Sequence, residues 1–198
     1  MPIYHKHYVI YKPFGILSQM GSNDERQNRK KQFLTELGTF PKGVMPIGRL
    51  DEKSEGLLLL TTDGKLSDTI NRGGIEKEYH VQLDGVIDPI SLARLREGVT
   101  IGLFGKKYRT KPCFVEFVKN IPALPEADRR IRMNTTRGTS WIRLVLTEGK
   151  FRQVRKMTAA VGFPTLRLIR TRIGSIDLDG LHEGEIRVLH KEKLDTIF

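Results

Sequence analysis

Residues 48–64 read Gly-Arg-Leu-Asp-Glu-Lys-Ser-Glu-Gly-Leu-Leu-Leu-Leu-Thr-Thr-Asp-Gly. This stretch runs from a polar loop into four consecutive leucines and ends in an Asp-Gly turn. Such a continuous apolar run, bounded by turn residues, predicts a buried central strand over residues 57–61. The loop before it carries Arg49 and Asp51, which are two positions apart and share a face in an extended chain. Because a neighbouring guanidinium favours the ionised form of a carboxylate, the pair predicts a nucleophilic aspartate.

The elements predicted around this strand favour an α+β fold with a largely antiparallel sheet. Strands outnumber helices and do not alternate regularly with them, which argues against a doubly wound parallel sheet. Alternating or continuous apolar residues predict further strands over residues 4–11, 78–84, 113–118, 141–147, 165–171 and 185–190. Helices are expected over residues 65–72, 88–98 and 151–161, and a polar loop over residues 19–32.

The helix expected after Asp88 shows how these boundaries are assigned. Asp88 suits the N-cap, Pro89 suits the first helical position and Gly98 suits the C-terminal stop. Apolar contacts are expected from Ile90, Leu92 and Leu95. The strand over residues 78–84 alternates apolar and polar side chains and is therefore expected to be half-buried.

The composition indicates a nucleic-acid partner. The chain has 198 residues, enough for one domain of ordinary size, and a formal net charge of +11. The charge is concentrated between Gly149 and Ile176, where seven basic residues occur without an acidic one. A solvated basic surface is the alternative, but opposite charges are normally interspersed on such surfaces. The seven residues are Lys150, Arg152, Arg155, Lys156, Arg167, Arg170 and Arg172.

Several other classes of protein are not expected. Cys113 is the single cysteine, so no intramolecular disulfide can form, and no Cys/His cluster has zinc spacing. No apolar run reaches the ~20 residues of a membrane-spanning helix, and the first residues lack the apolar core of a signal peptide. We therefore expect a cytoplasmic protein with no metal, no cofactor and no membrane partner.

Four separated motifs resemble those of the pseudouridine synthases of the ribosomal small-subunit synthase A and large-subunit synthase B, E and F group. The first two are Lys12-Pro13-x-Gly15 and the stretch from Gly48 to Gly64 quoted above. The third is Lys77-x-Tyr79, and the fourth runs from Glu148 to Arg170. Within the group the chain is most similar to the large-subunit synthase E branch, because its catalytic motifs begin close to residue 1.

The resemblance implies a pseudouridine synthase fold: a mostly antiparallel mixed sheet in two lobes with flanking helices and a central cleft. It implies one catalytic domain over residues 1–198, without the N-terminal S4 RNA-binding module that most relatives carry. It also implies a monomer that isomerises a uridine of large-subunit ribosomal RNA without a cofactor and does not act on DNA.

The resemblance also assigns the site residues. Asp51 matches the catalytic aspartate, Tyr79 the active-site tyrosine and Arg155 the basic residue that pairs with the aspartate, while Arg49 belongs to the same signature as Asp51. Leu168 matches an apolar residue near the target ring. The basic run is expected to hold RNA phosphates around a flipped-out nucleotide, through Lys150, Arg152, Lys156, Arg167, Arg170 and Arg172.

Two other functions remain open at this stage. One is a non-catalytic RNA-binding or ribosome-assembly protein that keeps the same scaffold, and the other is a synthase that acts on small-subunit ribosomal RNA or on transfer RNA. The presence of Arg49, Asp51, Tyr79 and Arg155 argues against the non-catalytic alternative. The sequence does not choose the uridine that is modified, because RNA shape and loop contacts leave no readable code in the protein.

Overall fold

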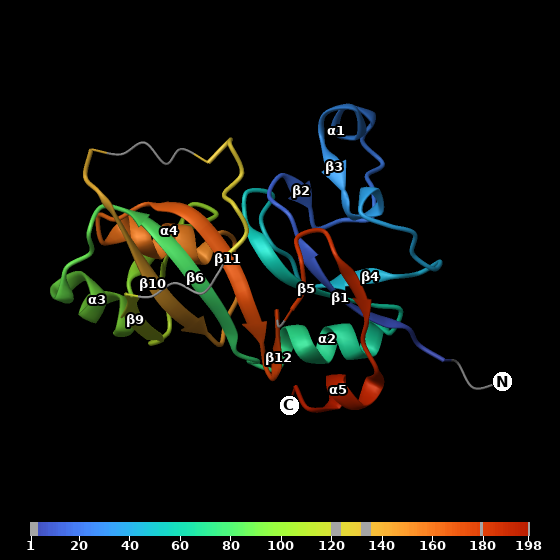
Figure 1. Cartoon of the computed structure of the whole chain (residues 1–198). Helices are drawn as coiled ribbons and strands as arrows, with labels where there is room; N and C mark the ends of the chain where they lie inside the picture. The colour runs from blue at the N-terminus through green and yellow to red at the C-terminus, as the bar shows by residue number, and fades with distance from the viewer. Residues whose placement is uncertain (1–3, 120–123, 132–135, 179, 198) are drawn as a thin grey trace. The chain divides into compact units, whose positions relative to one another are not determined.

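The chain folds into two compact units, which we describe separately. A computed structural model describes residues 4–119, 124–131, 136–178 and 180–197 (Figure 1). The terminal unit comprises residues 1–75 and 170–198, and the central unit comprises residues 76–169. Strand β11 (Thr165–Ile173) begins in the central unit and ends in the terminal unit. Helices and antiparallel strands occur together in the chain, so the predicted α+β class is confirmed.

The sheet of the terminal unit is built around the leucine strand. Strand β5 (Glu55–Thr61) lies between β1 (His7–Lys12) and the end of β11, and β13 (Ile186–Val188) pairs with the other edge of β1. Strand β4 (Met45–Ile47) also pairs with β5, and β12 (Ile176–Asp177) pairs with β11. The pairing of β1 with β5 is antiparallel. The predicted central strand is therefore confirmed.

All seven residues of β5 are buried, so both faces of this strand are covered. Leu58 and Leu60 pack into one core cluster with Ile10, Leu34 and Val44. Leu57 and Leu59 point to the opposite face, because successive strand residues alternate. Helix α2 (Gly64–Arg72), capped by the side chain of Asp63, packs against β4 and β5 and confirms the predicted helix. Helix α5 (Lys191–Asp195) lies near the C-terminus of the chain.

The segment expected to be a loop over residues 19–32 contains a helix. Helix α1 (Glu25–Lys30) starts at Asp24, whose carboxylate accepts hydrogen bonds from the backbone N–H groups of Arg26 and Gln27. No residue of this helix is buried, so it carries no apolar periodicity that a sequence pattern could reveal. Short elements flank it: β2 (Ile16–Leu17), β3 (Gln32–Phe33) and the 3-10 helix η1 (Leu34–Glu36).

The sheet of the central unit has the order β11, β6, β10, β9. Strand β6 (Lys77–Asp84) and strand β9 (Phe114–Val118) both pair antiparallel with β10 (Thr139–Leu146). Helix α3 (Pro89–Arg96) packs against β9, and helix α4 (Gln153–Ala160) contacts β7 (Thr100–Leu103). Strands β6, β9, β10 and β11 and both helices were predicted within a few residues of their observed boundaries.

Two expectations for the central unit are wrong. Strand β6 is buried on both faces, since His80 and Gln82 are buried as well as their apolar neighbours. Their cross-strand partners on β10 are the large side chains of Arg143 and Trp141. Ile90 does not contribute to the core, because 75% of it is exposed at the start of α3.

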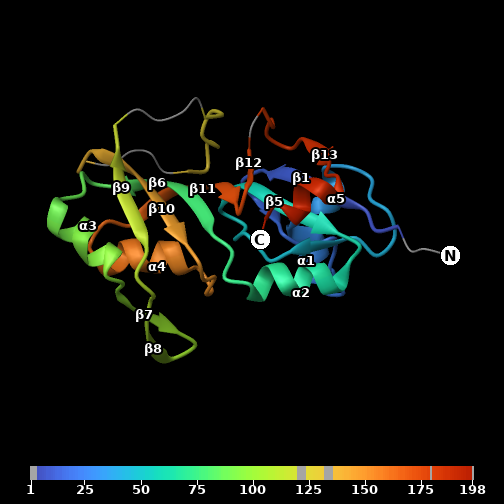
Figure 2. The ribbon, with the colours of Figure 1, turned by 90° about the horizontal axis from the view of Figure 1, so that it is seen from below.

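The β7–β8 hairpin was not predicted. Strands β7 and β8 (Lys106–Arg109) are joined by Phe104 and Gly105, which both have positive φ, at 49° and 80°. A two-residue turn of this kind matches the right-handed twist of its strands. Both strands are short and largely exposed, so they lack the apolar alternation that identifies a strand. The hairpin projects from the rest of the central unit (Figure 2).

No helix in the described residues is long and apolar enough to cross a membrane.

Gly56 allows β11 to approach β5 closely. It has a φ of 104°, and a Cβ atom there would lie 2.2 Å from the backbone oxygen of Arg170. We expect Gly56→Ala to lower the free energy of unfolding by at least about 3 kcal/mol, because both the φ angle and the contact oppose a side chain. Urea unfolding measures the change. Gly64→Ala is the control, since a Cβ at Gly64 meets nothing within 4 Å; an equal effect of both substitutions would contradict the prediction.

Candidate active site

Asp51 lies in the loop that connects β4 to β5 in the terminal unit. It is partly buried, and its backbone oxygen accepts a hydrogen bond of 3.0 Å from the N–H of Ser54, which closes a turn directly before β5. Gly48 enters the loop with a φ of 68°. The carboxylate is therefore carried by a short turn fixed to a fully buried strand, which is the rigid support that a reactive group requires.

Hydrogen bonds hold the backbone on both sides of Asp51. The buried hydroxyl of Ser18 donates to the oxygen of Leu50 (2.8 Å) and accepts from the N–H of Leu50 (3.0 Å). On the other side, the N–H of Gly15 donates to the oxygen of Glu52 (2.8 Å). The Glu52 carboxylate also pairs with Lys31 at 2.9 Å. Residues 15–31 thus fix the position of the Asp51 loop.

A fully buried lysine supports this arrangement. The Lys12 amine, with no exposed surface, donates to the oxygens of Pro13 (2.6 Å) and Ile16 (2.8 Å) and so closes the turn that presents Gly15. Burial lowers its pKa to about 7, against the opposing effect of the Glu55 carboxylate, and Arg170 lowers it further. A neutral amine still has two N–H groups, which is the number that these two carbonyls require.

Arg170 and Arg167 are buried and donate hydrogen bonds to backbone oxygens. Arg170 is 4% exposed, and its Nε donates to the oxygen of Leu57 at 2.7 Å. Arg167 is also 4% exposed and donates to the oxygen of Pro125 at 3.0 Å. The burial of both guanidinium groups argues against the phosphate contacts expected from the sequence. Arg172 is partly exposed and donates to the oxygen of Gly174.

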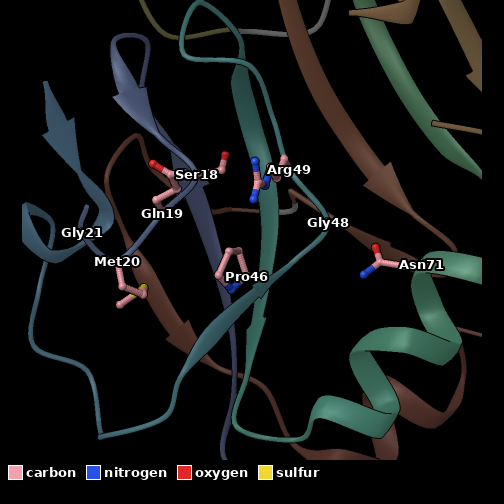
Figure 3. Close-up of a pocket in the computed structure, with 8 residues that line it drawn as sticks. All are labelled: Ser18, Gln19, Met20, Gly21, Pro46, Gly48, Arg49 and Asn71. Carbon is pink, nitrogen blue, oxygen red and sulfur yellow. The ribbon is translucent and has the colours of Figure 1, made fainter. Parts of the chain in front are cut away.

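Arg49 lines a pocket beside the Asp51 loop. The pocket has a volume of about 430 Å³ and lies within the terminal unit (Figure 3). Arg49 is exposed, so its guanidinium is accessible to a ligand. The other lining residues are Ser18, Gln19, Met20, Gly21, Pro46, Gly48 and Asn71.

The other predicted catalytic residues belong to the central unit. Tyr79 lies on β6 opposite Leu144 and is 8% exposed, so its ring is part of the core as well as a candidate for the site. Arg155 lies on α4, is partly buried, and its Nη1 donates to the oxygen of Thr165 at 3.4 Å. Leu168 on β11 is 4% exposed.

Glu148 organises the chain that leads into α4. Its carboxylate accepts hydrogen bonds from the Tyr108 hydroxyl, from the N–H of Lys111 (3.0 Å) and from Nε2 of Gln153 (2.6 Å). Burial opposes ionisation of Glu148, but these donors hold the pKa of its carboxyl below its ordinary value. Gln153 in turn accepts from the N–H of Lys150 (2.9 Å). This network fixes the basic segment at the start of α4, where Lys150 is exposed and Arg152 and Lys156 are partly exposed.

Comparison with known proteins identifies the family. Residues 6–160 match the family of RNA pseudouridylate synthases. The chain belongs to this family. The motifs quoted from the sequence up to Ala160 lie within the matched range, and Asp51, Tyr79 and Arg155 are among the residues it contains.

Individual relatives agree with the family match. The chain is 40% identical over 182 residues to a ribosomal large subunit pseudouridine synthase E of Xanthomonas campestris pv. campestris, covering 91% of this chain and 93% of that protein. It is 37% identical over 180 residues to a synthase of the same name from Vibrio parahaemolyticus, covering 89% and 71%. A crystal structure of a pseudouridylate synthase has a TM-score of 0.77 at 26% identity and covers 98% of this chain and 74% of that one.

Some residues that shape the site were not identified from the sequence. Ser18 belongs to no recognised motif. A serine that holds a distant backbone segment cannot be told from a surface serine by its neighbours in the sequence. Lys12 and Glu55 lie in the quoted motifs, but the sequence assigns no role to either. Their burial, 0% exposure for Lys12 and 1% for Glu55, is visible only in the fold.

The lowered pKa of Lys12 predicts that stability depends on pH. Between about pH 7 and the ordinary lysine pKa, the unfolded chain binds a proton that the folded chain does not, so stability rises with pH by up to about 1.4 kcal/mol per pH unit. Lys12→Met should remove this dependence. Urea unfolding at about pH 7 and about pH 9 measures it. Lys6→Met, a change at an exposed residue, should leave it intact; a flat profile in the unmodified protein would refute the assignment.

Proposed function

We propose that this protein isomerises a uridine of large-subunit ribosomal RNA to pseudouridine, with Asp51 as the catalytic carboxylate. The observation that carries the proposal is the family match over residues 6–160, which includes the Asp51 loop. The large-subunit substrate is inferred from relatives that are 37–41% identical and are named large subunit pseudouridine synthase E. Ribosomal RNA as partner also agrees with the net charge of +11.

The reaction is an isomerisation, so atoms balance without a co-reactant. The bond between the ribose C1′ and N1 of uracil breaks, the uracil turns, and C1′ bonds to C5. The C5 proton leaves and N1 gains a proton. Asp51 starts the reaction, either as a nucleophile that attacks the ribose or the uracil ring, or by assisting the departure of uracil. No energy-rich cofactor is required by this balance.

An ionised Asp51 is essential to every version of this mechanism. The permanent positive charge of Arg170 belongs to the same buried group as Lys12, whose amine also interacts electrostatically with Asp51. The family resemblance further assigns Arg155 to pair with Asp51 and Tyr79 to stack on the base, and we retain both roles as part of the proposal.

Binding of the RNA requires that the target nucleotide leave its stack, at a cost of a few kcal/mol. Phosphate contacts on both sides of that nucleotide offset this cost. We assign these contacts to Lys150, Arg152 and Lys156, with Arg49 on the terminal unit. Arg167 and Arg170 are left out of the phosphate contacts because both are buried and donate to backbone oxygens, whereas Arg172 is retained. Leu168 keeps the role that the resemblance assigns to it, as an apolar residue near the target ring.

Replacement of Asp51 tests the proposed chemistry. We expect Asp51→Asn to reduce tritium release from C5-labelled uridine in ribosomal RNA by at least about 10⁴-fold, because an amide cannot replace the carboxylate. Asp68→Asn, at an exposed residue paired with Arg72, is the control and should retain activity. Full activity of Asp51→Asn would eliminate the carboxylate mechanism, and an inactive unmodified protein would favour the non-catalytic alternative. Mapping of pseudouridines in cells that lack the protein identifies the substrate, and an unchanged large-subunit RNA would refute it.

Ser18 is expected to act on turnover by positioning Asp51. Ser140 provides a matched control, because its hydroxyl donates to the oxygen of Gly85 (2.7 Å) and accepts from the N–H of Ile87 (3.0 Å), in the same way that Ser18 holds Leu50. Both serines are 4% exposed. Each Ser→Ala substitution should lower the free energy of unfolding by about 1–3 kcal/mol.

Only Ser18→Ala should also lower kcat, by roughly 10- to 100-fold, with KM for RNA nearly unchanged. Steady-state kinetics well below the melting temperature of each variant measures the effect. Equal kcat values for the two variants would show that Ser18 has a structural role alone.

A further inference from the structure

The β7–β8 hairpin carries a bulky residue where its turn favours a small polar one. Phe104 has a φ of 49° and is 87% exposed. Turns with positive φ at both central positions favour Asn-Gly, whereas this chain has Phe-Gly. Among the described residues other than glycine, only Phe104 and Arg152 have positive φ. A local conflict of this kind is expected where function has been favoured over stability.

Phe104 stacks on Phe151, and both rings keep exposed surface. The two rings are stacked, with centroids 5.9 Å apart and planes inclined by 28°, and Phe151 is itself 57% exposed. They come from different parts of the chain, the hairpin tip and the segment before α4. An aromatic pair this exposed gains little from burial, so it offers a surface on which a further planar group can stack.

Lysine side chains occur on the same hairpin and beside the start of α4. The Lys156 amine lies 5.1 Å from the centre of the Phe151 ring and donates to the oxygen of Gly102 on β7 at 2.7 Å. The Lys150 amine lies 5.2 Å from the ring of Tyr108 on β8. Lys106 and Lys107 are exposed on the same hairpin. Aromatic faces interleaved with cations are the features by which proteins bind single-stranded nucleic acid.

The hairpin is fixed to the segment that carries the proposed RNA-binding residues. Tyr108 donates its hydroxyl hydrogen to Glu148, and Lys156 links α4 to β7. The aromatic pair is therefore held in a defined position relative to Arg152 and Arg155 within the central unit.

We propose that Phe104 and Phe151 form a stacking platform for an unpaired base of the RNA substrate, with Lys150 and Lys156 contacting the adjoining phosphates. The inference rests on the proposed function for its ligand, an RNA. The positive charge near the rings favours a polyanion as ligand over an apolar protein partner. The exposed aromatic ring favours an unpaired base, because a base inside a duplex is already stacked.

Substitutions at Phe104 separate stacking from stability. Phe104→Asn supplies the residue that the turn favours, so the melting temperature should rise by about 2 °C while RNA binding weakens. The probe is a labelled single-stranded RNA of about 12 nucleotides, measured by fluorescence anisotropy. Loss of one stacked base predicts a Kd increased by about 5- to 150-fold. Phe104→Tyr, which keeps the ring, should retain the Kd of the unmodified protein.

Ile90→Ala is the control for a loss of exposed apolar surface elsewhere in the central unit, and its Kd should not change. A Kd for Phe104→Asn equal to that of the unmodified protein would overturn the platform, as would an equal loss in Phe104→Tyr. A parallel tritium-release assay of the unmodified protein distinguishes the two proposals. If the unmodified protein releases tritium but Phe104→Asn binds RNA as tightly as the unmodified protein does, only the platform is refuted. If RNA binding depends on Phe104 but the unmodified protein releases no tritium, only the synthase proposal is refuted.

Discussion

A lysine amine with no exposed surface is the constraint on which the Asp51 site depends. The hydrogen bonds of Lys12 to Pro13 and Ile16 close the turn after β1. That turn is followed by the hydroxyl of Ser18, which holds Leu50. The hydrogen bonds that fix the Asp51 loop thus begin at Lys12, about 40 positions earlier in the chain. Burial of the Lys12 amine lowers its pKa and therefore opposes folding at neutral pH.

The basic residues of the fourth motif divide into two sets that composition does not separate. Arg167 and Arg170 donate to backbone oxygens inside their units, and the planar guanidinium of arginine suits such buried contacts. Lys150 and Lys156 lie over aromatic rings at the surface. The first set holds strand β11 in place, and the second set leaves charge available to a polyanion. A single run of positive charge therefore serves both the fold and the proposed binding of RNA.

Backbone strain and exposure coincide at the β7–β8 hairpin. Phe104 opposes its own turn geometry and is largely exposed, so its presence is explained neither by local propensity nor by burial in the core. Glu148 compensates for this unfavourable turn, because its carboxylate accepts three hydrogen bonds that hold the hairpin and the start of α4 together. Rigid support of this kind lets an unfavourable residue persist in one conformation.

The sequence by itself determined the α+β class, the leucine strand, the helices before and after β6, and the family, because these depend on apolar periodicity, capping residues and motifs that are local in the chain. It did not reveal helix α1, the β7–β8 hairpin, the burial of His80 and Gln82, or the role of Ser18. Helix α1 and the hairpin bury too few residues to leave a periodic pattern. Which arginines are buried, and which backbone groups Ser18 and Lys12 hold, depends on contacts between residues far apart in the chain, and only the tertiary structure decided them.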